Sequence, residues 1–228
     1  MRSLWTLILV LATLQGLAQS REQYTVKPGE IPDKVLPAEA VYYFPEFRKG
    51  EANFKTGGKS TQQFNYNCLL DELQFLAAGG DTLAIAEPHE IRMIQIDSVI
   101  FYFDKGYLRQ VSTQNGYKIA VRERLIQTDA KKEAAYGSTS GTGAINSIES
   151  VRMGNNVFKL EVRREVLFAK RHAFYIGDRY NRFSPASKKG FASLFPEKKK
   201  LIETFVKEQH TDFNSPGDLQ RLLEACAQ

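Results

Sequence analysis

Short apolar runs separated by turn residues dominate the chain between Val41 and Arg124. Within these runs apolar and polar positions alternate; Val99, Phe101 and Phe103, for example, share one side of an extended chain. Short glycine-containing breaks separate neighbouring runs at Gly57–Gly58, Gly79–Asp81, Asp104–Gly106 and Asn115–Gly116. Because such breaks are typical of tight hairpins, the pattern predicts an antiparallel meander of about seven to nine short strands.

A second strand-like region follows position 150. Residues 157–168 and 173–176 return to the strand pattern, and the basic run Lys170–His172 lies between them. We expect this run to break the pattern, so that the two segments form one more hairpin.

The pattern changes to a helical period from Ser187 onward. The clearest apolar stripe follows Ser215 and Pro216, which suit the N-cap and the first turn of a helix, and consists of Leu219, Leu222, Leu223 and Cys226. The whole chain therefore predicts an α+β fold. An antiparallel β meander over 41–186 forms a sandwich or a partly open barrel, and a C-terminal segment over 187–228 packs two or three short helices on it.

The N-terminus has the pattern of a secretory signal peptide. Residues 1–18 contain one positive charge at Arg2, an apolar run from Leu4 to Leu14, and small residues at Gly16 and Ala18. The apolar run is too short for the ~20 residues that span a bilayer. We therefore expect an exported protein that does not span the membrane and lies in the periplasm or outside the cell. Residues 19–40 contain three prolines and predict an extended leader.

Glycine, serine and threonine dominate the middle of the segment 129–150, which predicts a flexible loop. The loop has no Gly-Lys-Ser/Thr sequence and no Gly-x-Ser-x-Gly sequence, so neither a phosphate-binding loop nor a nucleophile elbow is predicted.

The two cysteines leave two alternatives open. Export would permit a disulfide between Cys68 and Cys226. Cys226, however, continues the apolar stripe of the last predicted helix, and Cys68 continues the alternation of Phe64 and Tyr66. This placement favours two buried thiols. With two Cys and three scattered His, no metal site or cofactor is predicted.

The charged residues, 25% of the chain, give a formal net charge of +5. Basic charge is concentrated after position 150, with 15 basic and 9 acidic side chains. Lys198, Lys199 and Lys200 are candidates for binding an acidic partner or an anionic envelope component, and the alternative is a solvated face. No nucleic-acid-binding motif is present, and a nucleic-acid partner is not expected.

Asn65, Tyr66 and Asn67 form a second candidate binding site, because the two amides lie on one face of a predicted strand. The alternative is that they satisfy backbone groups within the fold. A glycan hydrolase would need two carboxyl groups across a cleft, for which the chain offers Asp71, Glu72, Asp81, Asp97 and Asp104. Most of these acids occupy turn positions, so no catalytic residue is predicted.

Several sequence stretches resemble a group of exported proteins of Bacteroidota. The matching stretches are Phe64–Phe75, Gly80–Ala84, Phe101–Phe103, Gly106–Leu108, Ala135–Ser140 and Lys188–Phe205. This resemblance implies an envelope protein and assigns no catalytic residues.

We therefore expect a non-catalytic binding or assembly component of the cell envelope. An exposed apolar patch would favour this function. The alternatives are a carrier that encloses a small ligand among aromatic strands, and, less favoured, a carboxylate-dependent glycan hydrolase.

Overall fold

The computed structural model describes residues 23–128, 152–153, 156–157, 162 and 165–228. The expected signal peptide and the expected loop over 129–150 lie outside the described residues. The strands are β1 (Gln23–Val26), β2 (Arg48–Phe54), β3 (Lys59–Asn67), β4 (Glu72–Leu76), β5 (Thr82–Ala84), β6 (Ile91–Ile96), β7 (Val99–Phe103), β8 (Tyr107–Gln114), β9 (Tyr117–Thr128), β10 (Arg152–Met153), β11 (Asn156–Val157), β12 (Val166–Gly177) and β13 (Phe183–Pro185). The helices are α1 (Pro32–Val35), α2 (Ala38–Val41), η1 (Pro88–Glu90), α4 (Lys188–Leu194), η2 (Pro196–Lys198), α5 (Lys199–Glu208) and α6 (Pro216–Cys226).

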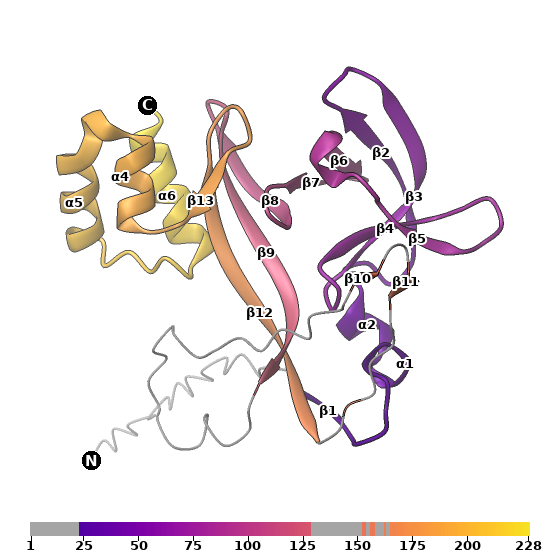
Figure 1. The fold of residues 1–228 in the computed structure, drawn as a ribbon. Coiled ribbons are helices and arrows are strands. Elements are labelled where there is room, and N and C mark those ends of the chain that lie inside the picture. Colours follow the sequence, from indigo (N-terminus) through magenta and orange to yellow (C-terminus); the bar gives the residue numbers. More distant parts are fainter. Residues whose placement is uncertain (1–22, 129–151, 154–155, 158–161, 163–164) are drawn as a thin grey trace, which may run out of the picture.

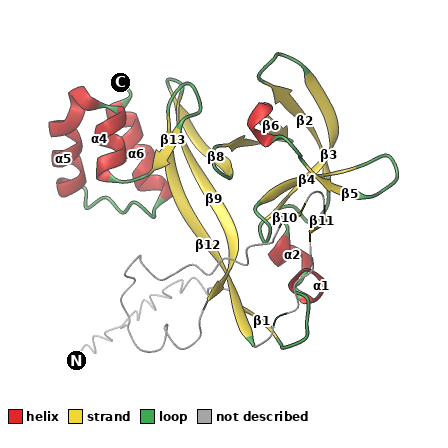
Figure 2. Cartoon of the chain, viewed as in Figure 1, coloured by secondary structure: helices red, strands yellow, loops and turns green. Residues whose placement is uncertain are grey.

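The fold is an antiparallel sheet of 11 strands that carries the C-terminal helices at one end (Figures 1 and 2). The strand order is β1-β12-β9-β8-β7-β6-β2-β3-β4-β5, and β13 pairs with β12. All four predicted hairpins are confirmed, as β2–β3, β4–β5, β7–β8 and β8–β9. The sheet is not one continuous meander, because β6 pairs with β2 and so joins two meanders side by side.

The turn between β8 and β9 illustrates why these breaks form hairpins. Asn115 and Gly116 have φ values of 49° and 83°. Both residues are therefore left-handed, as a tight turn that follows the twist of the two strands requires. Asn115 is further fixed by its side-chain amide, which donates to the carbonyl oxygen of Ala227 at 2.6 Å.

The expected break at Lys170–His172 is wrong. β12 runs without interruption from Val166 to Gly177 and pairs with β9 from Leu167 to Gly177. Basic side chains do not end a strand as glycine or proline does, and here they have partners. Lys170 donates to the carbonyl oxygen of Glu39, and the His172 ring lies 3.1 Å from the carboxylate of Glu123.

The proline-containing N-terminal segment is not simply extended. Residues 23–26 form the edge strand β1 on β12, and α1 and α2 follow as single helical turns. Pro32 begins α1, a position where its missing N–H costs no helical hydrogen bond. Because Val26 and Ala40 are fully buried, this segment belongs to the core.

One face of the long strands β9 and β12 contributes to two separate cores. Leu125 and Phe168 belong to the sheet core, the apolar cluster enclosed by the curved sheet and the N-terminal segment. Ile119 and Ile176 lie further along the same face and belong to the helix core, the cluster between the sheet and α4–α6. Because side chains alternate between the two faces of a strand, the same set of alternate positions contributes to both the sheet core and the helix core.

The sheet curls until the turn after β3 meets β9. The backbone N–H of Leu125 donates to the carbonyl oxygen of Cys68 at 2.8 Å, and the Tyr66 hydroxyl donates to the carbonyl oxygen of Glu123 at 2.7 Å. These contacts make the fold a partly open barrel, since β3 and β9 do not form a continuous ladder.

The two cysteines lie in different cores and are both free and buried. The favoured interpretation as two core thiols is therefore confirmed. Burial raises the pKa of Cys68 to about 12 and that of Cys226 to about 11, so both thiols stay protonated at neutral pH.

Gly50 marks the closest approach between β2 and its neighbours. A Cβ atom at Gly50 would lie 2.6 Å from the carbonyl oxygen of Gln95 and 3.0 Å from the Phe64 ring. Gly50→Ala should therefore lower the free energy of unfolding by about 2 kcal/mol, as overpacking of a close contact does. Chemical denaturation measures the change. Gly58→Ala is the control, because its Cβ would meet the Phe54 ring at an ordinary 3.9 Å, and an equal loss in both variants would contradict this packing.

Candidate functional site

Asn65 holds the chain segment that precedes β2. Its side-chain oxygen accepts from the backbone N–H of Phe44 at 3.0 Å, and its amide donates to the carbonyl oxygens of Phe44 and Glu46. The same oxygen accepts from the N–H of Tyr66. Asn65 is fully buried, so these bonds replace those that water would make.

The side chains of Tyr66 and Asn67 also form hydrogen bonds to other groups of the chain. The Asn67 oxygen accepts from the N–H groups of Leu69 and Leu70, which shapes the turn after β3. The Tyr66 hydroxyl bonds to Asp71, and burial together with the nearby Asp71 carboxylate raises the pKa of this tyrosine. These contacts match the alternative in which the three residues serve the fold.

The three lysines of the second candidate site do not converge on one polar centre. Lys198 donates to the backbone oxygen of Gln228 at 3.0 Å, and Lys199 and Lys200 begin α5 as exposed side chains. Glu203 lies on the same helix and pairs with Lys188 at 3.5 Å. The arrangement has the mixed charge of a solvated face.

The candidate carboxylates of a hydrolase have separate partners. Asp71 pairs with Arg122, Asp97 pairs with Arg48 at 3.0 Å, and Asp104 accepts from the N–H of Phe183 at 2.9 Å. Asp71 and Asp97 also have positive φ values, which places them as turn residues. Glu72 is buried in β4, and Asp81 lies in the exposed turn between β4 and β5.

A charged belt separates the two cores on the shared face of β9 and β12. The Glu123 carboxylate accepts from Arg109 at 2.7 and 2.8 Å and lies 3.1 Å from the ring nitrogen of His172. The Arg109 guanidinium also stacks 5.0 Å from the ring centre of Tyr43. Burial alone would raise the pKa of Glu123, but the hydrogen bond to His172 and the charge of Arg109 outweigh it and hold this pKa below 4.5.

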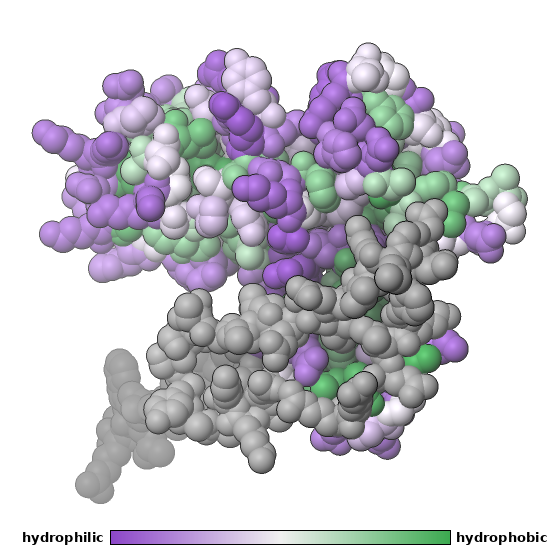
Figure 3. Space-filling model, viewed as in Figure 1, coloured by the Kyte–Doolittle hydropathy of each residue, from purple (hydrophilic) through white to green (hydrophobic). Residues whose placement is uncertain are grey.

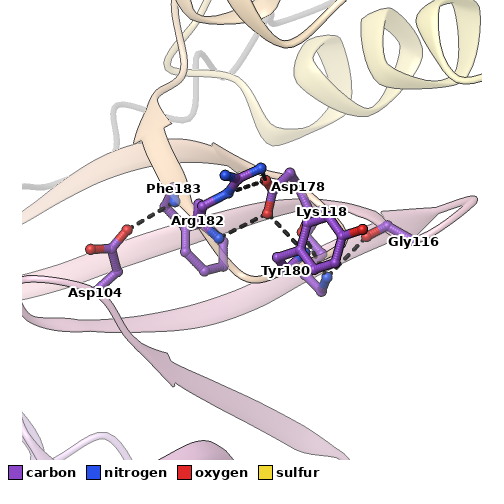
Figure 4. A network of polar contacts seen from close by, with 7 residues as sticks. All are labelled: Asp104, Gly116, Lys118, Asp178, Tyr180, Arg182 and Phe183. Carbon is purple, nitrogen blue, oxygen red and sulfur yellow. Dashed lines mark hydrogen bonds and ion pairs between the residues drawn. The ribbon is translucent and has the colours of Figure 1, made fainter. Parts of the chain in front are cut away.

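A densely hydrogen-bonded polar cluster lies in the turn between β12 and β13, at Asp178–Arg182 (Figure 4). One carboxylate oxygen of Asp178 accepts from the N–H groups of Tyr180 and Arg182 at 2.8 and 2.9 Å, and the other accepts from the Arg182 guanidinium at 2.6 Å. Burial would raise the pKa of Asp178, but these bonds lower it, so the carboxylate is charged at neutral pH. A single buried side chain therefore fixes the path of the whole turn.

A lysine of the neighbouring strand β9 also holds this turn by hydrogen bonds. Lys118 of β9 is buried and donates to the carbonyl oxygens of Gly116 and Asp178 at 2.9 and 3.0 Å. Burial lowers the pKa of Lys118, although the nearby Asp178 carboxylate opposes this effect. Lys118 thus ties the β8–β9 turn to the β12–β13 turn.

Tyr180 projects from the turn that these bonds hold. It is 80% exposed, the largest exposed fraction among the exposed apolar side chains of the described residues. The Arg182 guanidinium lies 5.4 Å from its ring centre, and Arg179 stacks 5.2 Å from the ring centre of Tyr117. The Asp178–Arg182 turn therefore presents an exposed aromatic ring, with Arg182 beside it, on a fixed backbone. This turn is not among the sites predicted from the sequence, although Gly177-Asp178 and Asn181 between two apolar runs are turn residues that indicate it.

Two features that would indicate a function are absent from the described part of the chain. No group of three or more His, Cys, Asp or Glu side chains there has the arrangement of a metal site. Among the same residues, no helix is long and apolar enough to cross a membrane.

Comparison with protein-family models, curated proteins and solved structures found no match to this chain. The resemblance to exported proteins of Bacteroidota therefore depends on the sequence stretches alone and stays a prediction.

Replacement of Asn65 tests its role in the fold. Asn65→Ala should lower the free energy of unfolding by about 2–3 kcal/mol, because it leaves buried backbone groups of Phe44 without a partner. Thermal denaturation measures the loss. Gln62→Ala, an exposed position on the same strand, is the matched control and should change the melting temperature little. A stable Asn65→Ala protein would show that these bonds are dispensable.

The charged belt predicts a pH-dependent contribution to stability. The pKa of Glu123 is lowered in the folded state, so its contribution is present above pH 4.5 and is lost as the pH falls through the folded value. At pH 7, Glu123→Gln should lower the free energy of unfolding by about 1–2 kcal/mol, and this difference should shrink on acidification. Denaturation at a series of pH values measures it.

Glu203→Gln, which removes a surface ion pair, is the control for Glu123→Gln and should have a small effect at every pH. A loss in Glu123→Gln that does not depend on pH would contradict the assigned role of the carboxylate charge.

Proposed function

We propose that this protein is an exported, non-catalytic binding or assembly component of the cell envelope that engages a protein partner through the Asp178–Arg182 turn. The observation that carries the proposal is the 80% exposed ring of Tyr180 on a turn fixed by buried polar groups. The pattern of residues 1–18 supports export.

The rigidity of the turn favours binding. Three hydrogen bonds to the Asp178 carboxylate and one from Lys118 to the Asp178 carbonyl oxygen order the turn before any partner arrives. A partner then meets a surface whose backbone entropy is already lost, which reduces the cost of association. Tyrosine and arginine are also the residue types that most often dominate the binding energy of protein interfaces.

The charges of the turn indicate the chemistry of the partner. The Asp178 carboxylate forms an ion pair with Arg182. Arg179 stacks on the Tyr117 ring and has no carboxylate partner among the described residues. We therefore propose a partner surface with an apolar recess for Tyr180 and an acidic group for Arg179.

The carrier alternative receives less support from the packing of the sheet core. Rings expected to line a ligand cavity contact one another instead. Tyr66 lies 5.6 Å from Phe101 and 6.2 Å from Tyr107, and Tyr43 lies 5.9 Å from Phe101, measured between ring centres. These contacts are typical of a filled aromatic core.

A cross-linking pull-down from the envelope extract of the source organism tests the proposal, with the chain from residue 19 onward as bait. Tyr180→Ala should reduce capture of a saturable protein partner at least tenfold, because truncation of a central aromatic anchor commonly costs about 2 kcal/mol or more. The melting temperature should not change, since the ring is exposed.

Two controls define the result. Tyr180→Phe keeps the ring and should retain most of the capture, and Val35→Ala truncates an exposed apolar side chain of α1 and should retain all of it. Equal capture by wild type and Tyr180→Ala would remove the turn from the proposal.

A further inference from the structure

The edge of the sheet at β5 is open. β5 is the last strand in the sheet order, it pairs only with β4 among the described residues, and all three of its residues are exposed. The carbonyl oxygen of Asp81 and the N–H of Ile85 bond toward β4. Because backbone groups alternate in direction along an antiparallel strand, those of Thr82 and Ala84 point away from the sheet.

Apart from the shortness of β5, the hairpin that carries this edge has little protection against pairing. Between Leu76 and Ala86 the only charged residue is Asp81, whereas a quarter of the whole chain is charged. Natural edge strands commonly carry lysine, proline or a bulge that prevents association. Figure 3 shows apolar and neutral residues gathered where the β4–β5 hairpin projects from the molecule, and Leu83 is 41% exposed there.

We infer that β5 pairs with β5 of a second copy of this chain around a twofold axis at Leu83. In this register Thr82 lies opposite Ala84 of the second copy, so the outward N–H and C=O groups of the two strands satisfy one another. The two Leu83 side chains meet on the axis as a close cross-strand pair. Asp81 lies opposite Ile85 of the second copy, so the two carboxylates stay at opposite ends of the interface.

The near absence of charged residues from the β4–β5 hairpin favours a second copy of this chain as the partner of β5. A surface that pairs with itself must avoid like charges across the axis, and this hairpin meets that condition. The inference goes beyond the proposed function and does not depend on it. β5 and β12 lie toward opposite ends of the sheet order, so the dimer would leave both Asp178–Arg182 turns available to a partner.

Sedimentation equilibrium of the chain from residue 19 onward tests the inference. The concentration range should be roughly 10 μM to 1 mM, because an interface well below ~1,000 Å² is weak. Wild type should show a reversible monomer–dimer equilibrium. Ala84→Pro removes an outward N–H and keeps the bonds to β4, and Leu83→Lys places two like charges on the axis. Each variant should weaken dimerisation at least tenfold with little change in melting temperature.

Leu201→Lys is the matched control, because Leu201 on α5 is exposed to the same degree, 40%. It should dimerise as wild type does. A wild type that is monomeric over the whole range, or dimerisation that survives both β5 substitutions, would overturn the inference. Neither result affects the role of Tyr180, which is measured by partner capture.

Discussion

The pairing of β9 with β12 is the interaction on which the rest of the structure depends. Eleven residue pairs in unbroken register, from Thr128 with Leu167 to Lys118 with Gly177, form a ribbon much longer than the other described pairings. Because side chains alternate strictly along both strands, a slip of one strand by one residue would move all of its apolar side chains to the opposite face. A slip of β9 would remove Leu125 from the sheet core and Ile119 from the helix core together, and a slip of β12 would do the same to Phe168 and Ile176. The register therefore determines both cores.

The charged belt between the two cores also depends on the register of β9 and β12. Glu123 and His172 are directly opposite one another in the β9–β12 ladder, and Arg109 reaches them from β8. A hydrogen-bonded polar pair directly opposite across a ladder favours one register over its neighbours, as the apolar pairs on the same face do. Polar groups in the middle of this apolar face thus add to the specification of the pairing. The stacking of Arg109 on Tyr43 extends this specification to the N-terminal segment.

Local chemistry explains which parts of this fold could be predicted from the sequence. The hairpin turns depend on residues such as Asn115 and Gly116, whose conformational preference is visible in the sequence itself. The cap at Ser215 and the stripe that ends at Cys226 were visible for the same reason, and the structure confirms both. The pairing of β6 with β2 could not be predicted, since it joins segments that no turn connects. The strand break expected at Lys170–His172 was wrong, because Lys170 and His172 find partners in distant parts of the chain, which the local sequence does not show. The candidate site also depends on residues that are distant in the sequence, because Lys118 lies 60 residues before Asp178 and shows no motif with it.

The C-terminal helices cannot be separated from the sheet as an independent domain, because both parts share the strands β9 and β12. Ile119 and Ile176 are covered by α4–α6, yet they belong to strands whose other halves complete the sheet core. A chain that stopped before Ser187 would keep every described strand and still expose a wide apolar surface at one end of its longest ribbon. The helices therefore belong to the same folding unit as the sheet, and the strands expose this apolar surface to aggregation until α6 packs on it.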